Sequence, residues 1–293
     1  MKPASFHYVA PRSEEELLAS LVEYGDEARL LAGGQSLVPM MNFRAATPSV
    51  LIDINRLPSL SYIEVGADAV EIGALTRHAM LEDSDALRLR LFLIVEAMAH
   101  LGHRAVRNRG TLGGSLALAY PNAELPLLLV ALGGELRLRS PRGDRSVQAA
   151  DFISGPLSTV LADDEFIRSA RVPLPGPAAG TAFVEISRRH GDFALAAAAA
   201  VVDLDADGMI SAVHAAISGG QGWPLRSPAL ERALAGEKPV PQLIDDAVHS
   251  ISDEIDVDDD RELPAGYRRL LLTTVLQRAL QNAAERAERR HAH

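Results

Sequence analysis

The sequence predicts an α+β fold in which mixed helix–strand units are followed by a small sheet with helices. Short apolar runs alternate with helical patterns over the first 58 residues, runs of period two follow between residues 60 and 140, and three strand-like runs follow residue 180. The chain has 293 residues, of which 47% are hydrophobic and 23% charged, so it can bury a substantial core or two packed domains. Disordered and collagen-like architectures are excluded.

The first unit is predicted to contain helices and two short strands. Ser13 and Glu16 have the spacing of a capping box, so a helix is expected from about Ser13 to Tyr24. Residues 29–32 (RLLA) predict a strand that ends at a Gly-Gly turn, and a helix with a proline in its first turn follows. Residues 50–54 (VLIDI) predict the second strand.

The second unit is predicted to begin with a hairpin. Two β-like runs flank the turn Gly66-Ala67-Asp68 and lead into a helix. Apolar residues recur at helical spacing from Leu89 to Leu101, and residues 103–115 (HRAVRNRGTLGGS) are expected to form a glycine-punctuated loop. A long apolar segment spans residues 125–132, and residues 134–140 (GELRLRS) alternate as a strand with one polar face.

Residues 173–180 (PLPGPAAG) predict a domain boundary, because three prolines and two glycines stand among eight residues. Three strands are expected after it, at residues 181–187, 194–204 and 209–217, and helices then dominate. The final helix is expected to lie on this sheet with one apolar face inward, formed by Tyr267, Leu270, Leu271, Thr274, Leu276 and Leu280.

Charge and composition exclude several classes of partner. The net charge of −10 results from 39 acidic and 29 basic residues, so no nucleic acid or anionic membrane partner is expected. The most apolar stretch, residues 193–202, is about half of the roughly 20 residues that a membrane-spanning helix needs. The N-terminus lacks the apolar core of a signal peptide, so a cytoplasmic protein is expected.

No metal site and no catalytic residue are predicted. Cysteine is absent, which excludes disulfides, a cysteine nucleophile and thiolate-held metal centres in this chain. The acidic run 253–262 lacks the ligand positions and the glycine of an EF-hand loop and is interpreted as a solvated loop. His100 and His103 have no further ligand nearby, and no Ser-His-Asp or paired-carboxylate motif stands out.

Two glycine loops are the candidate binding motifs. Paired glycines between a strand and a helix let backbone amides approach a phosphate without lysine or arginine. The first loop taken alone is better explained as an ordinary Gly-Gly turn, because it matches neither the GxGxxG nor the GxxxxGK(S/T) pattern, but two such loops can hold an extended diphosphate ligand from both sides. The first consists of Leu31, Ala32, Gly33, Gly34, Gln35, Ser36, Leu37 and Val38, and the second of Thr111, Leu112, Gly113, Gly114 and Ser115.

Both loops belong to segments that resemble a known family. Residues 30–60 (LLAGGQSLVPMMNFRAATPSVLIDINRLPSL) and 103–126 (HRAVRNRGTLGGSLALAYPNAELP) resemble the two FAD-binding segments of the medium subunit of molybdenum-containing hydroxylases. This family includes carbon monoxide dehydrogenase, quinoline 2-oxidoreductase and xanthine dehydrogenase. Residues 187–194 (SRRHGDFA) and 266–280 (GYRRLLLTTVLQRAL) are similar as well, and the resemblance extends to about Ala284.

The resemblance implies a fold and a site. Residues 1–176 would form a two-lobed FAD-binding domain of the vanillyl-alcohol oxidase-like (PCMH) type, with lobes at about 1–58 and 59–176. Residues 177–293 would form a small C-terminal α/β domain with a three-stranded antiparallel sheet and helices. Both glycine loops would surround the FAD diphosphate, and Leu101, Glu124 and Ile167 match further positions that contact the flavin or its adenine arm.

The sequence departs from the family pattern at three positions. Ser115 stands where many members have asparagine, and Leu118 and Tyr120 replace a histidine and an aspartate. We hypothesise that Tyr120 packs on or near the flavin ring, the alternative being that it only fills the interface between lobes. Arg188, Arg189, His190 and Asp192 are expected to position the flavin or, alternatively, to be solvated at a strand edge.

The resemblance also implies the biochemical role. A molybdenum cofactor on a large subunit would hydroxylate the substrate, and two [2Fe–2S] clusters on a small subunit would pass electrons to the FAD of this chain, which passes them to an external acceptor. The assembly would be a dimer of heterotrimers. Within the resemblance, the sequence of residues 108–117 (NRGTLGGSLA) favours an N-heteroaromatic substrate. The alternatives are a self-contained FAD-dependent oxidase or reductase of the same fold and a non-enzymatic nucleotide-binding module.

Overall fold

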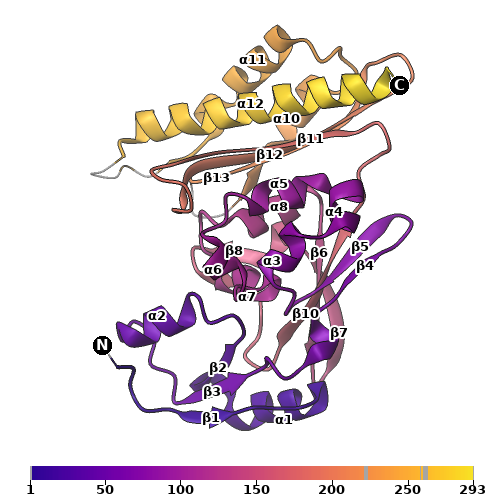
Figure 1. Cartoon of the computed structure of the whole chain (residues 1–293). Coiled ribbons are helices and arrows are strands. Elements are labelled where there is room, and N and C mark those ends of the chain that lie inside the picture. Colours follow the sequence, from indigo (N-terminus) through magenta and orange to yellow (C-terminus); the bar gives the residue numbers. More distant parts are fainter. Residues whose placement is uncertain (1, 221–223, 258, 260–262, 293) are drawn as a thin grey trace.

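The described residues form three sheets and one short hairpin, with helices between them (Figure 1). The structure is a computed structural model that describes residues 2–220, 224–257, 259 and 263–292. Figure 1 shows the N-terminal sheet at one end, a central unit next to it, and the C-terminal sheet and its long helix at the other end. Among the helices of these described ranges, none combines the length and apolar character that a membrane crossing requires.

The N-terminal sheet is parallel, with strand order β1-β3-β2. Strands β2 and β3 and the helix after the Gly-Gly turn confirm the predicted pattern, whereas β1, of three residues, was not predicted. The elements are β1 (His7–Val9), α1 (Glu14–Tyr24), η1 (Gly25–Glu27), β2 (Ala28–Leu31), α2 (Leu37–Asn42), β3 (Val50–Asp53) and η2 (Pro58–Leu60).

Helix α1 begins as its sequence predicts. The Ser13 hydroxyl accepts a hydrogen bond from the Glu16 amide at 3.2 Å, and the Glu16 carboxylate accepts one from the Arg12 amide at 2.7 Å. The two side chains therefore satisfy backbone donors that the first turn leaves free. Leu17 and Leu21 of this helix are buried against the sheet with Ile52 of β3.

The central sheet is antiparallel, with strand order β4-β5-β10-β6-β7. The predicted hairpin and the strand at 134–140 are confirmed as β4–β5 and β6. The strands are β4 (Ile63–Val65), β5 (Ala69–Gly73), β6 (Glu135–Ser140), β7 (Gly143–Gln148) and β10 (Phe166–Pro173), and a hairpin of β8 (Ile153–Gly155) and β9 (Ser158–Thr159) accompanies them.

Helices of the central unit correct two expectations. The helix expected over residues 89–101 is split at Leu91, and the segment 103–115, expected to be a loop, contains one helix and the start of another. Gly113 and Gly114 therefore lie in a helical first turn rather than in a loop. The helices are α3 (His78–Glu82), α4 (Asp85–Arg90), α5 (Phe92–Met98), α6 (Arg104–Arg107), α7 (Leu112–Leu118), α8 (Glu124–Ala131) and α9 (Ala149–Phe152).

The C-terminal sheet is antiparallel and has four strands rather than the predicted three. The additional strand has only two residues, too few for a period-two pattern. Its strands are β11 (Gly180–Ser187), β12 (Ala194–Leu204), β13 (Ile210–Ser218) and β14 (Leu225–Arg226), and its helices are α10 (Pro228–Leu234), α11 (Pro241–Ser250), η3 (Ser252–Glu254) and α12 (Ala265–His291).

The alanine run of β12 is explained by its position between two cores. Ala197 and Ala199 belong to the core shared with α5 and α8, whereas Ala196 and Ala198 belong to the core under α12. Because both faces of the strand are covered, its sequence is continuously apolar instead of alternating. Small side chains let helices approach both faces of the sheet closely.

Helix α12 covers the outer face of this sheet, as predicted (Figure 1), and three of the six side chains expected to face inward are buried, those of Leu271, Leu276 and Leu280. Tyr267 and Leu270, expected to face inward, are 52% and 59% exposed. The buried face is shifted around the helix and consists of Leu271, Leu272, Val275, Leu276, Ala279, Leu280, Ala283, Ala284 and Ala287.

One polar contact joins α12 to the central unit. The Arg286 guanidinium binds both oxygens of Glu96 on α5, at 2.7 and 3.1 Å, and donates to the Thr181 carbonyl at 2.6 Å. Glu96 also accepts a hydrogen bond from the Phe183 amide at 2.9 Å. A bidentate pair with further backbone bonds fixes α12, β11 and α5 together.

Candidate functional site

The structure brings the two glycine loops into contact. A Cβ atom on Gly33 would lie 2.3 Å from the Arg109 carbonyl oxygen and 2.8 Å from the Gly110 Cα, both just before the second loop. A Cβ on Gly114 would lie 3.9 Å from the Ala32 Cβ. Segments that are nearly eighty positions apart in sequence therefore pack backbone against backbone, and only glycine fits at residue 33.

The first loop presents free backbone donors. Within the described part of the chain, none of the amides from Gly33 to Leu37 donates a hydrogen bond to another group of the protein. Gly34 has φ +69°, in the left-handed region that favours glycine, and the Val38 amide returns to the Gly34 carbonyl at 3.1 Å. Successive unpaired amides in such a turn form a concave anion-binding surface. This loop can therefore hold a phosphate group without a cationic side chain.

The second loop differs from the first, contrary to the expectation that both offer the same backbone chemistry. The amides of Leu112 and Gly113 already donate to the carbonyls of Thr76 and Ala74, at 3.0 and 2.8 Å. The Thr111 hydroxyl caps α7 by accepting from the Gly114 amide at 3.2 Å. The second loop therefore contributes close backbone approach and hydroxyl groups, and the free amides come from the first.

A chain of hydrogen bonds connects the loops on the side of β3. The Asn55 amide group donates to the Ala32 carbonyl at 2.8 Å, and the Asn55 side-chain oxygen accepts from Arg77 at 2.6 Å. Arg77 also donates to the Arg109 carbonyl at 2.8 Å. Sequence reasoning missed both residues, although the Asp-x-Asn pattern after strand β3 is a turn signal that marks Asn55.

A buried histidine lies below the second loop. The two ring nitrogens of His78 are buried and have no hydrogen-bond partner in the described structure, and a Cβ on Gly110 would lie 2.7 Å from the ring. Burial lowers the pKa of His78 to about 4; the nearby Thr111 backbone opposes this shift, and the guanidinium groups of Arg107 and Arg77 add to it. The ring is therefore neutral at physiological pH and acts as packing under Gly110.

Ile167 and Leu101 are buried near the second loop. Ile167 lies on β10, and the carbonyl of the next residue, Arg168, accepts from the amide of Ala74, the residue on which Gly113 packs. Leu101 follows α5 and is 8% exposed, and its carbonyl accepts from Arg107 at 3.1 Å. Both side chains belong to the central core.

Tyr120 lies at the contact between the central unit and the β11–β12 turn. Its ring is 4.2 Å from the ring of Phe193, centroid to centroid, with a tilt of 35°. Asn122 donates to the Ala194 carbonyl at 2.8 Å in the same place. Ala119 has φ +47°, a conformation that non-glycine residues rarely adopt and that turns Tyr120 away from α7. The aromatic pair thus joins the predicted tyrosine to the 187–194 segment.

Glu124 is a buried carboxyl group beside a second one. It is 4% exposed at the start of α8, and burial raises its pKa to about 7, with a further rise from the charge of Glu185 on β11. Burial raises the pKa of Glu185 to about 7 as well, and one of its oxygens is buried without a hydrogen-bond partner in the described residues. The two groups are therefore largely protonated below neutral pH.

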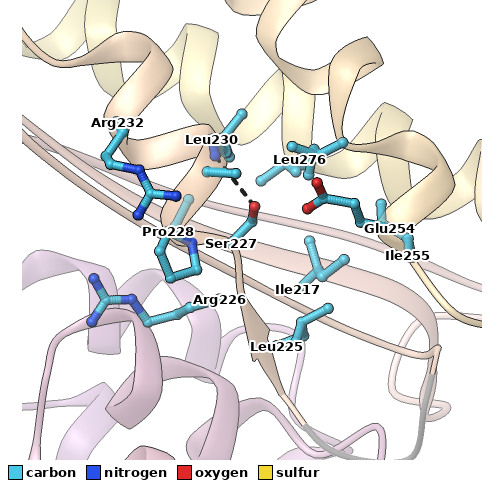
Figure 2. Close-up of a pocket in the computed structure, with 13 residues that line it drawn as sticks. Ile217, Leu225, Arg226, Ser227, Pro228, Leu230, Arg232, Glu254, Ile255 and Leu276 are labelled. Carbon is cyan, nitrogen blue, oxygen red and sulfur yellow. Dashed lines mark hydrogen bonds between the residues drawn. The ribbon is translucent and has the colours of Figure 1, made fainter.

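A separate cavity of about 540 Å³ lies in the C-terminal unit. Figure 2 shows Arg232 and Glu254 on opposite sides of it, with Ile217 and Leu276 among the apolar lining. None of the residues that line it belongs to the predicted cofactor site. Across the described residues no group of three or more histidine or acidic side chains is placed to hold a metal ion.

Two family models match the chain and identify the domain that contains the glycine loops. The model for the FAD-binding domain in molybdopterin dehydrogenase matches residues 4–175, and the model for the CO dehydrogenase flavoprotein C-terminal domain matches residues 181–283. The chain is a member of the FAD-binding medium subunits of the molybdopterin hydroxylases. Both matches together cover nearly the whole sequence, and they place both glycine loops within the FAD-binding domain.

Individual members of this family are similar over their full length. The 6-hydroxypseudooxynicotine dehydrogenase complex subunit alpha of Paenarthrobacter nicotinovorans is 39% identical, over 98% of this chain and 97% of the relative. The caffeine dehydrogenase subunit beta of a Pseudomonas strain is 36% identical over the same shares. The carbon monoxide dehydrogenase of Hydrogenophaga pseudoflava has a chain with a TM-score of 0.94 and 35% identity, covering 98% of this chain and 99% of its own.

Membership in this family makes the chain an oxidoreductase subunit of a multi-subunit molybdenum dehydrogenase. The chain matches a flavoprotein subunit along its full length, and the relatives differ in the substrate for which their complexes are named. The observed α+β architecture agrees with the carbon monoxide dehydrogenase chain, including the C-terminal antiparallel sheet under a long helix.

Proposed function

We propose that the chain binds FAD with its diphosphate on the first glycine loop. The observation that carries this proposal is the run of free amides from Gly33 to Leu37, which begins where Arg109 and Gly110, just before the second loop, pack against Gly33. A diphosphate carries two negative charges and many acceptor oxygens, which consecutive amide donors satisfy. The hydroxyl groups of Thr111 and Ser115 complete the donor set.

The remaining predicted residues are assigned to the flavin and its adenine arm. In this proposal Leu101 and Ile167 supply apolar contacts, Glu124 supplies a carboxyl group, and Tyr120 lies beside the flavin ring. The tilted ring contact of Tyr120 with Phe193 supports this placement, because it extends the aromatic surface into the 187–194 segment. These side chains bind and orient the cofactor, and none is assigned a covalent role.

We further propose that the subunit transfers electrons within a heterotrimer. When bound, FAD collects electrons that arrive singly and delivers them in pairs to an external acceptor. The electrons would come from [2Fe–2S] clusters of a small subunit and originate at a molybdenum cofactor of a large one. The absence of cysteine in all 293 residues supports this division of labour, since such clusters need thiolate ligands from another chain.

The proposed assembly is a dimer of heterotrimers in the cytoplasm. The proposed domain division is 1–176 for the FAD-binding domain, with lobes of 1–58 and 59–176, and 177–293 for the C-terminal domain. An N-heteroaromatic substrate is favoured, because relatives are named for caffeine, nicotine and quinoline, although others are named for carbon monoxide and glyceraldehyde.

Purification of the chain with its partner subunits tests this proposal. Addition of substrate under anaerobic conditions is expected to bleach the flavin absorbance of the complex, whereas the isolated chain with FAD stays oxidised with the same substrate. Bleaching by the isolated chain would instead favour a self-contained flavin enzyme. A chain that stays colourless after addition of FAD would contradict the proposal.

A further inference from the structure

Asn55 and Arg77 connect the two glycine loops without belonging to either. We infer that they are positioning residues for the cofactor site: they hold the carbonyl of Ala32 and the carbonyl of Arg109 in one hydrogen-bonded chain and so set the spacing of the loops. The inference rests on the proposed binding of FAD. It adds two residues, one in the turn after β3 and one just before α3, to a site that the sequence motifs confine to the loops.

Asn55 is itself held in place from the N-terminal sheet. Asp53, at the end of β3, accepts from both the backbone and the side-chain amide of Asn55, at 2.9 and 2.6 Å. The other oxygen of Asp53 accepts from the Tyr8 hydroxyl at 2.5 Å, which ties β1 to the same group. The side chain of Asn55 therefore has one orientation, with its amide group on the Ala32 carbonyl and its oxygen turned toward Arg77.

Arg77 belongs to the central unit by its backbone. It forms an isolated antiparallel bridge with Thr111, in which the amides of His78 and Leu112 donate to the carbonyls of Gly110 and Thr76, each at 3.0 Å. Its side chain then leaves this bridge and bonds the Arg109 carbonyl and Asn55. The guanidinium fork thus makes one bond within its own unit and one to the N-terminal unit.

The bonded carbonyls are those that determine where the free amides lie. The Ala32 carbonyl belongs to the peptide group whose N–H is that of Gly33, the first free donor of the first loop. The Arg109 carbonyl oxygen is the atom nearest to the position that a Cβ on Gly33 would take. With both carbonyls fixed, the free amides keep one direction relative to the second loop. Without the bonds, the peptide group before Gly33 can rotate, so binding of a diphosphate must also order the loop, and this loss of entropy lowers the affinity.

The experiment measures FAD affinity of the full chain by fluorescence titration. Arg77→Met and Asn55→Leu keep side-chain size but remove the bonds, and each is expected to raise the Kd for FAD about tenfold, as for loss of one or two hydrogen bonds to a charged group. The double variant is expected to match the weaker single variant, because either change breaks the same chain. Arg77→Lys, with a single ammonium in place of the fork, is expected to be intermediate.

The matched control is Arg142→Met, which removes an exposed arginine bound to both oxygens of Asp164 and is expected to leave FAD affinity unchanged. The phosphorus NMR resonances of bound FAD provide a second readout and are expected to shift in Arg77→Lys but not in Arg142→Met. A purely structural role would lower the melting temperature of the FAD-free chain and leave these resonances in place.

Two results would overturn the inference. The first is that Arg77→Met and Asn55→Leu bind FAD with wild-type affinity and leave the phosphorus resonances unshifted. The second is that the losses of FAD binding free energy in the two single variants add up in the double variant. Failure of the wild-type chain to bind FAD would contradict the proposed function instead, so the two failures are distinguishable.

Discussion

Substitution of Gly33 by alanine tests the contact between the glycine loops. The added Cβ would lie 2.3 Å from the Arg109 carbonyl oxygen, 2.8 Å from the Gly110 Cα and 2.9 Å from the Arg109 carbonyl carbon. All three are backbone atoms, so no side chain can rotate away. To restore even 3.0 Å to the oxygen, the loops must separate by at least 0.7 Å, the difference between the two distances.

This separation is expected to weaken FAD binding measurably. Overpacking of this kind costs about 1–3 kcal/mol, and 1.4 kcal/mol corresponds to about a tenfold change in affinity. The Kd of Gly33→Ala for FAD is therefore expected to rise by about 5- to 100-fold in a fluorescence titration. Part of the strain will also appear as a lower melting temperature of the FAD-free chain.

The matched control is Gly266→Ala, at the start of α12, where an added Cβ meets no atom within 4 Å. Its FAD affinity is expected to equal that of the wild type, and its stability to be equal or slightly higher, because alanine favours a helix over glycine. If Gly33→Ala bound FAD as tightly as Gly266→Ala and melted at the same temperature, the close contact of the loops would be refuted.

Three further predictions concern the junction between the units. Burial raises the pKa of Glu185 to about 7 from its ordinary value near 4.5, so its contribution to stability is present below pH 4.5 and is lost as the pH rises through 7. Glu185→Gln is therefore expected to be as stable as the wild type at pH 4.5 and to have a higher unfolding free energy than the wild type at pH 8, by about 1–3 kcal/mol. Equal melting curves of the two proteins at pH 8 would contradict this. Glu96→Ala leaves Arg286 without its partner and is expected to lower the unfolding free energy by about 1–3 kcal/mol in urea titrations, whereas a loss below a few tenths would mean that this ion pair does not tie α12 to α5. Tyr120→Ala removes the ring that contacts Phe193 and is expected to change the absorbance spectrum and reduction potential of bound FAD; unchanged values would show that Tyr120 only fills the interface.

The sequence allowed prediction of elements whose signals are local. The capping box at Ser13, the hairpin around Gly66 and the long strands β12 and β13 were all predictable, because caps, turns and apolar runs depend on neighbouring residues. Helix α7 was missed because two glycines disfavour a helix. The structure needs them there, since a Cβ on Gly113 would lie 2.7 Å from the Ala74 Cβ.

The parts that could not be predicted depend on contacts between distant segments. Both loops were identified from their glycines, but not that the amides of Leu112 and Gly113 are already paired, since that depends on carbonyls at Thr76 and Ala74. Asn55 and Arg77 were missed for the same reason, because their bond joins the turn after β3 to the segment before α3, 22 positions further along the chain. The inward face of α12 was predicted only in part. Leu271, Leu276 and Leu280 are buried as expected, whereas Tyr267 and Leu270 are exposed, because apolar residues lie on several sides of the first two turns.

The most direct test of the account compares FAD with riboflavin as ligands of the cofactor-free chain. Since the free amides of the first loop are assigned to the diphosphate, FAD is expected to bind one per chain, and riboflavin, which lacks a diphosphate, at least about 100-fold more weakly. ADP is expected to compete with FAD. Equal binding of riboflavin and FAD, or no competition by ADP, would contradict the assignment of the first loop to the diphosphate.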